Sequence, residues 1–198
     1  MKKRKAVFLD RDGTINEEAG YPGDISLVRI FPWSFEAVRK INRAGFLAVV
    51  VTNQSGIARG FFREEALRQV HEEMKLAFEN RDAYLDGIFY CPHFRPSVLP
   101  EYDIDCSCRK PNPGMAYAAA EKLDIDLTSS YVVGDKTDDV LFGMNIQAKP
   151  ILVLTGFGRE TLEKLREQKI PPAFIAGNVL DAVDWILRKE RMTDPGNR

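Results

Sequence analysis

The sequence predicts an α/β protein built on a doubly wound parallel sheet with helices on both faces. Two observations lead to this prediction. Short apolar segments alternate with amphipathic, helix-like segments along the 198 residues. The apolar segments are also hydrophobic almost throughout, which is typical of strands covered on both faces of a parallel sheet. A chain that alternates strand and helix in this way usually builds one sheet with crossover helices.

Six segments are predicted to be strands, because each is short and rich in the Val, Ile and aromatic residues that favour strands. In chain order they are Ala6–Leu9, Phe46–Val51, Gly87–Tyr90, Tyr131–Val133, Ile151–Leu154 and Ala173–Ile175.

Six helices are predicted between and after these strands, and several have recognisable ends. Gly45 follows the first helix as a C-terminal cap, Pro113 lies in the first turn of the third, and Asn178 precedes the last as an N-cap. In chain order the helices are Ser34–Ala44, Arg63–Asn80, Pro113–Leu123, Asp138–Asn145, Glu160–Gln168 and Val179–Lys189.

Two segments depart from this alternation. Residues 11–30 form a long excursion after the first strand, and residues 91–112 form another after the third. Ordered loops of such length are usually functional or externally braced. We expect a single domain over residues 1–192 with a loop insertion at about 91–110, no large cap domain, and a flexible tail over residues 193–198.

Composition narrows the class of protein. The net charge is −1, so the chain lacks the basic surface typical of nucleic-acid-binding proteins. Its apolar runs are too short for a signal peptide or a membrane span. We therefore expect a cytoplasmic protein that binds neither nucleic acid nor membrane. In that compartment its three cysteines do not predict disulfides.

Polar side chains follow four of the predicted strands. In chain order they are Asp10 and Asp12, Thr52 and Asn53, Arg109 and Lys110, and Asp135. Because the carboxyl ends of parallel strands meet at one edge of a sheet, we expect these side chains to lie together. Carboxylates suit Mg²⁺, whereas a hydroxyl and an ammonium suit a phosphoryl group. The pattern predicts metal-assisted phosphoryl transfer.

The cysteines form a separate pattern inside the second long loop. Cys91 and His93 precede the loop, and Cys106 and Cys108 close it. Three thiolates and one imidazole make a closed tetrahedral ligand set for structural zinc. We expect such an ion to brace the loop whose end carries the basic pair, and to have no open position for catalysis.

The fuller motifs identify a family. The strings Asp10–Asn16, Thr52–Gly60, Cys108–Met115 and Gly134–Lys136 resemble the haloacid dehalogenase (HAD) superfamily of phosphatases, which has a Rossmann-like fold. Within it they resemble the heptose-1,7-bisphosphate 7-phosphatases and the related histidinol-phosphate phosphatases. The resemblance implies hydrolysis of the 7-phosphate of D-glycero-D-manno-heptose 1,7-bisphosphate, in ADP-heptose or related nucleotide-heptose biosynthesis. It implies Mg²⁺ and structural Zn²⁺ as cofactors, and we expect a monomer.

The resemblance also implies the roles of the catalytic residues. Asp10 is the nucleophile that forms an aspartyl-phosphate, and Asp12 is the general acid and then the general base. The Mg²⁺ ligands are Asp10, Asp12 and Asp135. Thr52 and Lys110 neutralise the transferring phosphoryl group.

Substrate contacts are implied around this centre. Arg109 is implied to recognise the substrate by binding its second phosphate, because a guanidinium suits bidentate phosphate contacts. The remaining contacts are implied for Glu18, Ala19, Gly20, Tyr21, Asn53, Gln54, Ser55 and Lys136. Asp139 is expected to orient Lys110 or a metal-bound water. The chain departs from the family at Phe94, where members often have a second histidine.

Three other interpretations remain open at this point. Histidinol phosphate keeps the mechanism and changes the substrate. A polynucleotide 3′-phosphatase shares the Thr-Asn-Gln-x-Gly pattern, but the near-neutral charge speaks against it. A receiver-like signalling domain also uses paired aspartates, Mg²⁺ and a lysine, but has no use for an acid two residues after its phosphorylated aspartate.

Two further features receive an ordinary structural interpretation. His71 lies on a charged helix, and we expect it to be exposed to solvent. The pair Phe61-Phe62 follows Gly60 and is expected to belong to the core, with the site entrance as the alternative.

Overall fold

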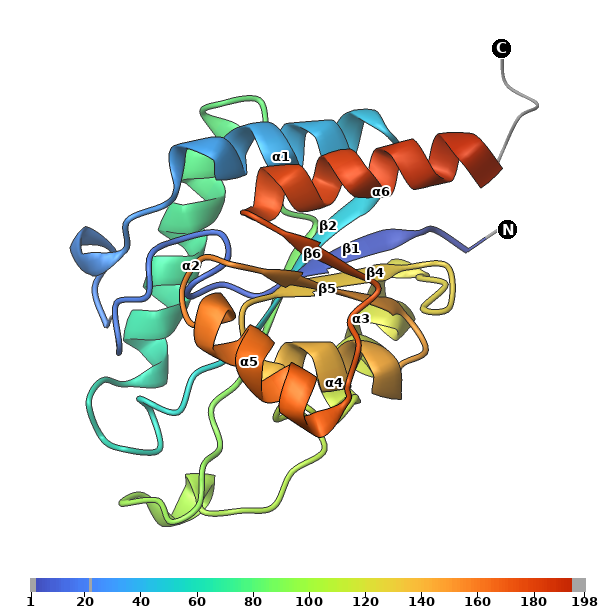
Figure 1. Cartoon of the computed structure of the whole chain (residues 1–198). Helices are drawn as coiled ribbons and strands as arrows, with labels where there is room; N and C mark the ends of the chain where they lie inside the picture. The colour runs from blue at the N-terminus through green and yellow to red at the C-terminus, as the bar shows by residue number, and fades with distance from the viewer. Residues whose placement is uncertain (1–2, 22, 194–198) are drawn as a thin grey trace.

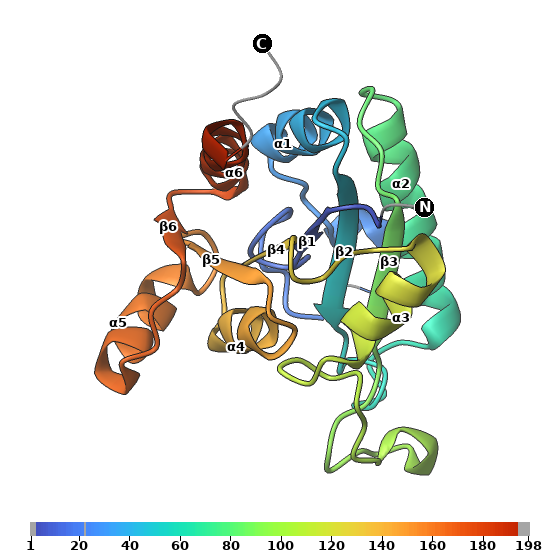
Figure 2. The same cartoon turned by 90° about the vertical axis from the view of Figure 1, so that its right-hand side faces the viewer.

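The computed structural model describes residues 3–21 and 23–193, in which six strands form one all-parallel sheet. Its order is β3-β2-β1-β4-β5-β6, which Figure 2 shows from β6 to β3. The chain therefore winds outward from β1 in one direction and, from β4 onward, in the other. The strands are β1 (Ala6–Leu9), β2 (Leu47–Asn53), β3 (Gly87–Cys91), β4 (Tyr131–Gly134), β5 (Lys149–Val153) and β6 (Phe174–Ala176).

Helices cover both faces of this sheet (Figure 1). One face carries α1 (Pro32–Arg43), α2 (Glu64–Glu79) and α6 (Val179–Thr193). The opposite face carries α3 (Gly114–Leu123), α4 (Thr137–Asn145) and α5 (Gly158–Gln168). Two short 3-10 helices, η1 (Ile25–Leu27) and η2 (Pro100–Tyr102), lie in the two long loops. The predicted α/β class is confirmed.

The uniformly apolar strands fill two cores. Along β1, Val7 and Leu9 pack with α1 and α6, whereas Ala6 and Phe8 pack with α3 and α4. Successive side chains of a strand point to opposite faces, so a strand covered on both sides must be apolar at every position. This is why β1 buries all four of its residues.

Most element boundaries differ from the sequence expectation by one or two residues, and two differences matter for the site and the C-terminal end. β2 continues through Thr52 and Asn53, because these residues pair with Tyr90 and Cys91 of β3. α6 continues to Thr193, the first residue of the expected tail, and residues 194–198 lie outside the described part of the chain. Among the helices that the structure describes, none has the length and hydrophobicity to cross a membrane.

Candidate active site

The polar residues predicted at the strand ends lie together at the carboxyl edge of β1, β2 and β4. Asp10 follows β1 directly, and its backbone N–H donates to the carbonyl of Val133 in β4 at 2.9 Å. β1 is flanked by β2 and β4, so the residues after these strands surround Asp10. A cavity of about 40 Å³ lies there, lined by Asp10, Asp12, Thr52, Asn53, Lys110, Lys136, Asp138 and Asp139.

Lys110 is a buried cation held by three oxygens. Its Nζ donates to Asp10 Oδ1 at 2.6 Å, to Asp139 Oδ1 at 2.6 Å and to the carbonyl of Val51 at 2.8 Å. These acceptors use all three ammonium hydrogens. Burial alone would lower the pKa of Lys110, but the two carboxylates outweigh it and the pKa is raised. Lys110 therefore stays charged beside Asp10, and Asp139 orients it as expected.

A cluster of carboxylates forms the other side of Asp10. Asp10, Asp135 and Asp139 each offer an oxygen, and these oxygens lie within 4.8 Å of one another. Burial, and then the charge of Asp10, raise the pKa of Asp135 to about 8. Its Oδ2 accepts from the backbone N–H of Phe157 at 2.8 Å, but its buried Oδ1 has no hydrogen-bond partner.

This donor set fits a hard divalent cation. Mg²⁺ prefers a few carboxylate oxygens and would favour the ionised form of Asp135, which burial otherwise opposes. Close packing also constrains the position: a Cβ on Gly13 or Gly156 would lie 2.3 or 2.2 Å from Asp135 Oδ2. Only glycine permits the turns after β1 and β5 to approach this carboxylate so closely.

The Asp12 carboxylate belongs to a different set of contacts. Arg11 donates to it from Nε at 3.1 Å and from Nη2 at 2.8 Å. Asn16 and Gln54 each add a hydrogen bond of 2.9 Å. Burial would raise the pKa of Asp12, but Arg11 and these donors lower it. Asp12 is therefore ionised and fixed in place, and its side chain lies outside the Asp10, Asp135 and Asp139 cluster.

The residues after β2 connect these two groups. Gln54 Nε2 donates to Thr52 Oγ1 at 2.8 Å as well as to Asp12. Asn53 exchanges two hydrogen bonds with the main chain of Lys110, at 3.0 and 3.1 Å. Asn53 thus holds the Lys110 segment against the end of β2, while the neighbouring Ser55 is buried without a side-chain contact to the carboxylates.

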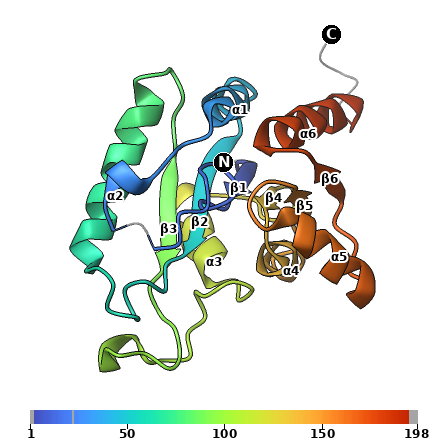
Figure 3. The same cartoon turned by 60° about the vertical axis from the view of Figure 1, so that its left-hand side comes forward.

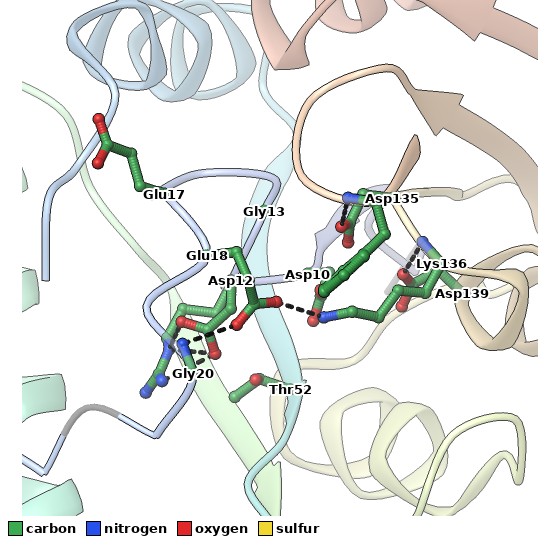
Figure 4. Close-up of polar contacts among 12 residues, drawn as sticks. Asp10, Asp12, Gly13, Glu17, Glu18, Gly20, Thr52, Asp135, Lys136 and Asp139 are labelled. Atoms are coloured by element: carbon green, nitrogen blue, oxygen red, sulfur yellow. Dashed lines mark hydrogen bonds and ion pairs between the residues drawn. The ribbon is translucent and has the colours of Figure 1, made fainter. Parts of the chain in front are cut away.

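Lys136 crosses the open side of the site (Figure 4). Its Nζ pairs with Glu18 Oε2 at 2.9 Å. Burial would lower the pKa of Lys136, but Asp10, Asp135 and Glu18 raise it. This ion pair attaches the loop of residues 17–21 to the site, with Ala19, Gly20 and Tyr21 exposed next to it.

His71 corrects a prediction from the sequence. Expected to be exposed, it is buried at 4% exposure and its Nε2 lies 3.2 Å from Arg11 Nη1. Although α2 is charged on its outer face, His71 shares the inner face with Val70 and Met74. Burial, and then the charge of Arg11, lower the pKa of His71 to about 3.

The cysteines and His93 converge at the end of β3. The sulfur atoms of Cys91, Cys106 and Cys108 lie 3.0 to 3.5 Å apart, and His93 Nδ1 lies 3.3 Å from the sulfur of Cys108. The three thiols are free, because a disulfide requires about 2.05 Å. Four soft ligand atoms around one point fit a tetrahedral ion.

Some residues of the site were missed from the sequence. Arg11, Asn16 and Gly156 carry contacts to Asp12 or Asp135 that no motif reasoning assigned. The available signal was Arg11 itself, an arginine placed between two aspartates directly after a buried strand. Phe61, expected in the core, is 60% exposed, and its ring centre lies 4.7 Å from that of Tyr21 in a tilted arrangement, so the core prediction is wrong for this residue.

Known proteins show the same architecture. A family model described as HAD-hydrolase-like matches residues 107–182. The crystal structure of the D,D-heptose 1,7-bisphosphate phosphatase from B. bronchiseptica, complexed with magnesium and phosphate, superposes with a TM-score of 0.81. It shares 31% identity, and the match covers 93% of this chain and 99% of that one. The corresponding enzyme from Burkholderia thailandensis gives a TM-score of 0.68 at 30% identity, over 93% of this chain and 99% of that one.

Sequence relatives agree with the structures. The D-glycero-β-D-manno-heptose-1,7-bisphosphate 7-phosphatase of Pasteurella multocida is 46% identical over 154 residues, which is 77% of this chain and 83% of that protein. The Escherichia coli K12 enzyme of the same name is 45% identical over 157 residues, 78% of this chain and 82% of that protein. At 45–46% identity over more than three quarters of its length, this chain belongs to the D-glycero-β-D-manno-heptose-1,7-bisphosphate 7-phosphatase family of HAD phosphatases.

Proposed function

We propose that this protein is a magnesium-dependent phosphatase that hydrolyses the 7-phosphate of D-glycero-D-manno-heptose 1,7-bisphosphate. The observation that carries the proposal is that the carboxylates of two neighbouring aspartates lie in different surroundings. Asp10 lies in the cation-binding cluster beside Lys110, whereas Asp12 is held by Arg11, Asn16 and Gln54 outside it. Two carboxylates in different surroundings suit two different chemical roles.

The first half-reaction transfers the phosphoryl group to Asp10. Lys110 occupies Asp10 Oδ1, and among the described residues none donates to Oδ2, so Oδ2 is available to attack. The new oxygen–phosphorus bond forms as the bond from phosphorus to the sugar oxygen breaks. The approaching phosphate dianion raises the proton affinity of Asp12, which takes a proton from solvent water and then gives it to the sugar oxygen as that oxygen leaves.

The second half-reaction releases phosphate. Asp12, now ionised, takes a proton from a water molecule whose oxygen attacks phosphorus. The Asp10 carboxylate leaves and is regenerated. The fixed hydrogen bonds from Asn16 and Gln54 keep the Asp12 carboxylate in one orientation for both proton transfers.

Positive charge next to Asp10 lowers the barrier for both steps. Lys110 and the hydroxyl of Thr52 face the cavity and stabilise the phosphoryl oxygens. Magnesium, when bound, supplies further neutralisation of the same oxygens. We assign it to Asp10, Asp12 and Asp135. Because the Asp12 carboxylate is engaged by Arg11, any ligand that Asp12 supplies comes from its main chain.

The remaining assignments are proposals of the same kind. We place structural zinc at Cys91, His93, Cys106 and Cys108, and substrate contacts at Arg109, Lys136 and the exposed loop of residues 18–21. Asn53, Gln54 and Ser55 complete the sugar-phosphate site. All of these groups come from one chain and one sheet, so the site needs no residue from a second copy, and we propose a single catalytic domain and a monomer.

A phosphate-release screen tests the function. We expect heptose 1,7-bisphosphate to exceed other sugar mono- and bisphosphates and histidinol phosphate in kcat/KM. A large preference for histidinol phosphate, or for a monophosphate without a second anionic group, would refute the heptose assignment. A stable phosphoprotein without multiple turnover would instead identify a receiver-like domain.

Substituting each aspartate in turn distinguishes the two proposed roles. Asp10→Asn is expected to lose turnover and the covalent phosphoprotein, because the nucleophile is gone. Asp12→Asn should lose turnover by about 100- to 10,000-fold, the range of general acid–base catalysis. Rapid acid quenching followed by intact-mass measurement detects the phosphoprotein. Finding it in Asp10→Asn would contradict the assignment of the nucleophile.

A further inference from the structure

Three loops meet beyond the carboxyl ends of β1, β2 and β3. Hydrogen bonds join the loops after β2 and β3: the carbonyl of Ala58 accepts from Ser97 Oγ at 2.7 Å and from the backbone N–H of Val98 at 3.0 Å. Tyr21, from the loop after β1, packs against Phe61 of the loop after β2, with ring centres 4.7 Å apart. The loop after β2 and the long loop after β3 extend from the same end of the sheet in Figure 3.

Arg59 lies at this meeting point between two aromatic rings. Its guanidinium carbon is 4.0 Å from the ring centre of Phe94 and 5.7 Å from that of Tyr21. Each ring comes from a different loop, and neither loop is adjacent to Arg59 in the chain. Stacking on rings uses the face of a guanidinium and leaves its N–H edge available to a planar or tetrahedral anion.

No carboxylate compensates this charge. Among the described residues Arg59 forms no ion pair, and its buried Nε has no hydrogen-bond partner. Leaving a buried charged donor unsatisfied is costly, so a position of this kind indicates an anion that the protein binds.

A second arginine shares the same ring. The Arg109 guanidinium carbon is 5.0 Å from the centre of Phe94, and its Nη1 donates to the carbonyl of His93 at 3.2 Å. The charge of Arg109 acts to lower the pKa of Asp138, but among the described residues no ion pair joins the two side chains. Two like charges on one aromatic ring repel each other, and a doubly charged anion between them would remove that repulsion.

We propose that Arg59 binds the second phosphate of the substrate together with Arg109, and that Phe94 is a positioning residue that holds both guanidiniums. This inference rests on the proposed function, because it needs a substrate with two phosphates. Arg59 then determines specificity for a bisphosphate over a monophosphate, while Asp10 and Asp12 carry out the chemistry on the other phosphate.

Paired kinetics test the proposal. We measure kcat and KM of the wild-type protein, Arg59→Gln, Arg59→Lys and Phe94→Leu with heptose 1,7-bisphosphate and heptose 7-phosphate. A charged hydrogen bond to phosphate predicts that Arg59→Gln lowers the bisphosphate-to-monophosphate ratio of kcat/KM by about 10- to 100-fold, mainly through KM. Arg59→Lys keeps the charge but loses the planar guanidinium. Phe94→Leu keeps Arg59 but removes the ring that positions it. The bisphosphate-to-monophosphate ratio of both variants should therefore lie between those of the wild type and Arg59→Gln.

Arg68→Gln is the matched control, since this exposed arginine pairs only with Glu65 on α2. Its ratio should equal that of the wild type. Thermal unfolding verifies that each variant is folded, and Arg59→Lys gives the result if Arg59→Gln is unstable. If a folded Arg59 variant keeps the wild-type bisphosphate-to-monophosphate ratio of kcat/KM, the proposal is overturned, even when kcat/KM falls for both substrates.

The same assay separates this inference from the proposed function. Fructose 1,6-bisphosphate and fructose 6-phosphate are included as a second pair. If the wild type prefers the fructose bisphosphate and Arg59→Gln abolishes that preference, the inference holds and the heptose assignment fails. If heptose bisphosphate is preferred and Arg59→Gln retains the preference, the function holds and the inference fails. A wild type without preference for either bisphosphate overturns both.

Discussion

At the scale of single residues, Arg11 is a fully buried charge that fixes the Asp12 carboxylate. It donates to Asp12 and to Gln54 Oε1, and its Nη1 lies 3.2 Å from His71 Nε2. A guanidinium has only donors, so Nε2 of His71 must accept and the ring proton lies on Nδ1. The neutral imidazole is thus part of the support for Arg11.

This arrangement predicts a pH dependence of stability. The folded state lowers the pKa of His71 from 6.5 to about 3. Between these two pH values the unfolded chain therefore binds a proton at His71 that the folded protein does not bind. The contribution of His71 to stability is present above pH 6.5 and is lost as the pH falls. The expected slope is about 1.4 kcal/mol of unfolding free energy per pH unit.

Urea unfolding at several pH values between 4.5 and 7.5 tests this slope. His71→Gln is the comparison, because glutamine can accept from Arg11 but does not titrate. The difference in unfolding free energy between the two proteins should stay constant above pH 6.5 and change progressively below it. A difference that does not vary with pH would refute the prediction.

At the scale of elements, the loop after β3 carries its functional residues at its far end. Cys108 belongs to the four-ligand cluster, and Lys110 follows two residues later. Asn53 holds the Lys110 main chain from one side and the cluster holds it from the other. An ion bound at the cluster would therefore restrain the position of Lys110 without touching substrate.

Removing that ion is expected to reduce catalysis by misplacing Lys110. We expect one zinc per chain in elemental analysis, and Cys106→Ser or chelation should remove it. The loop of residues 92–107 should then become sensitive to proteases, and kcat/KM should fall by about 100-fold, the effect of a displacement near 1 Å.

Ser107→Ala is the matched control within the same loop. Ser107 is exposed and lies between two ligands, but its side chain is not part of the cluster. This variant should retain zinc, protease resistance and activity. Full turnover by a zinc-free protein with an intact loop would show that the cluster has no influence on Lys110.

At the scale of the whole molecule, the order of strands decides which loops share the site. β1 is central, and its neighbours β2 and β4 are reached by connections that run in opposite directions. Open α/β sheets bind ligands where the winding direction changes, because the loops separate there. A cation bound between Asp10 and Asp135 would therefore join the ends of β1 and β4.

Magnesium is expected to stabilise the whole fold. Without it, burial raises the pKa of Asp135 to about 8 from 3.8, so the metal-free protein loses stability as the pH rises through this range. Magnesium reverses this loss by favouring the carboxylate, and binding at pH 7 should release a proton. At 100 times its dissociation constant it adds about 2.7 kcal/mol, or about 5–10 °C in Tm.

Calorimetric unfolding with and without magnesium measures this shift, and a pH indicator measures the proton. Asp135→Asn should abolish the magnesium shift and raise the Tm of the metal-free protein at pH 7. Asp138→Asn is the control, because Asp138 lies in the same turn but outside the carboxylate cluster. An equal magnesium shift in wild type and Asp135→Asn would place the cation elsewhere.

The sequence by itself determined the fold class, the approximate position of each strand and the sheet edge at which the main polar residues gather. Short, wholly apolar strands have one physical explanation, burial on both faces, and parallel strands necessarily bring their carboxyl ends together. Asp10, Lys110 and Asp135 could therefore be placed at one edge of the sheet without coordinates. The spacing of the cysteines likewise specified their cluster, because few other arrangements satisfy three thiols and an imidazole.

Only the tertiary structure decided which partner each polar side chain takes. The sequence predicts His71 at the surface, but α2 turns it inward onto Arg11. It predicts Phe61 in the core, but that ring is exposed and packs against Tyr21. Arg59 and Phe94 come from different loops and meet only in three dimensions. Local sequence carries periodicity and motif spacing, whereas the approach of distant loops depends on how the strands are ordered, which no local pattern encodes.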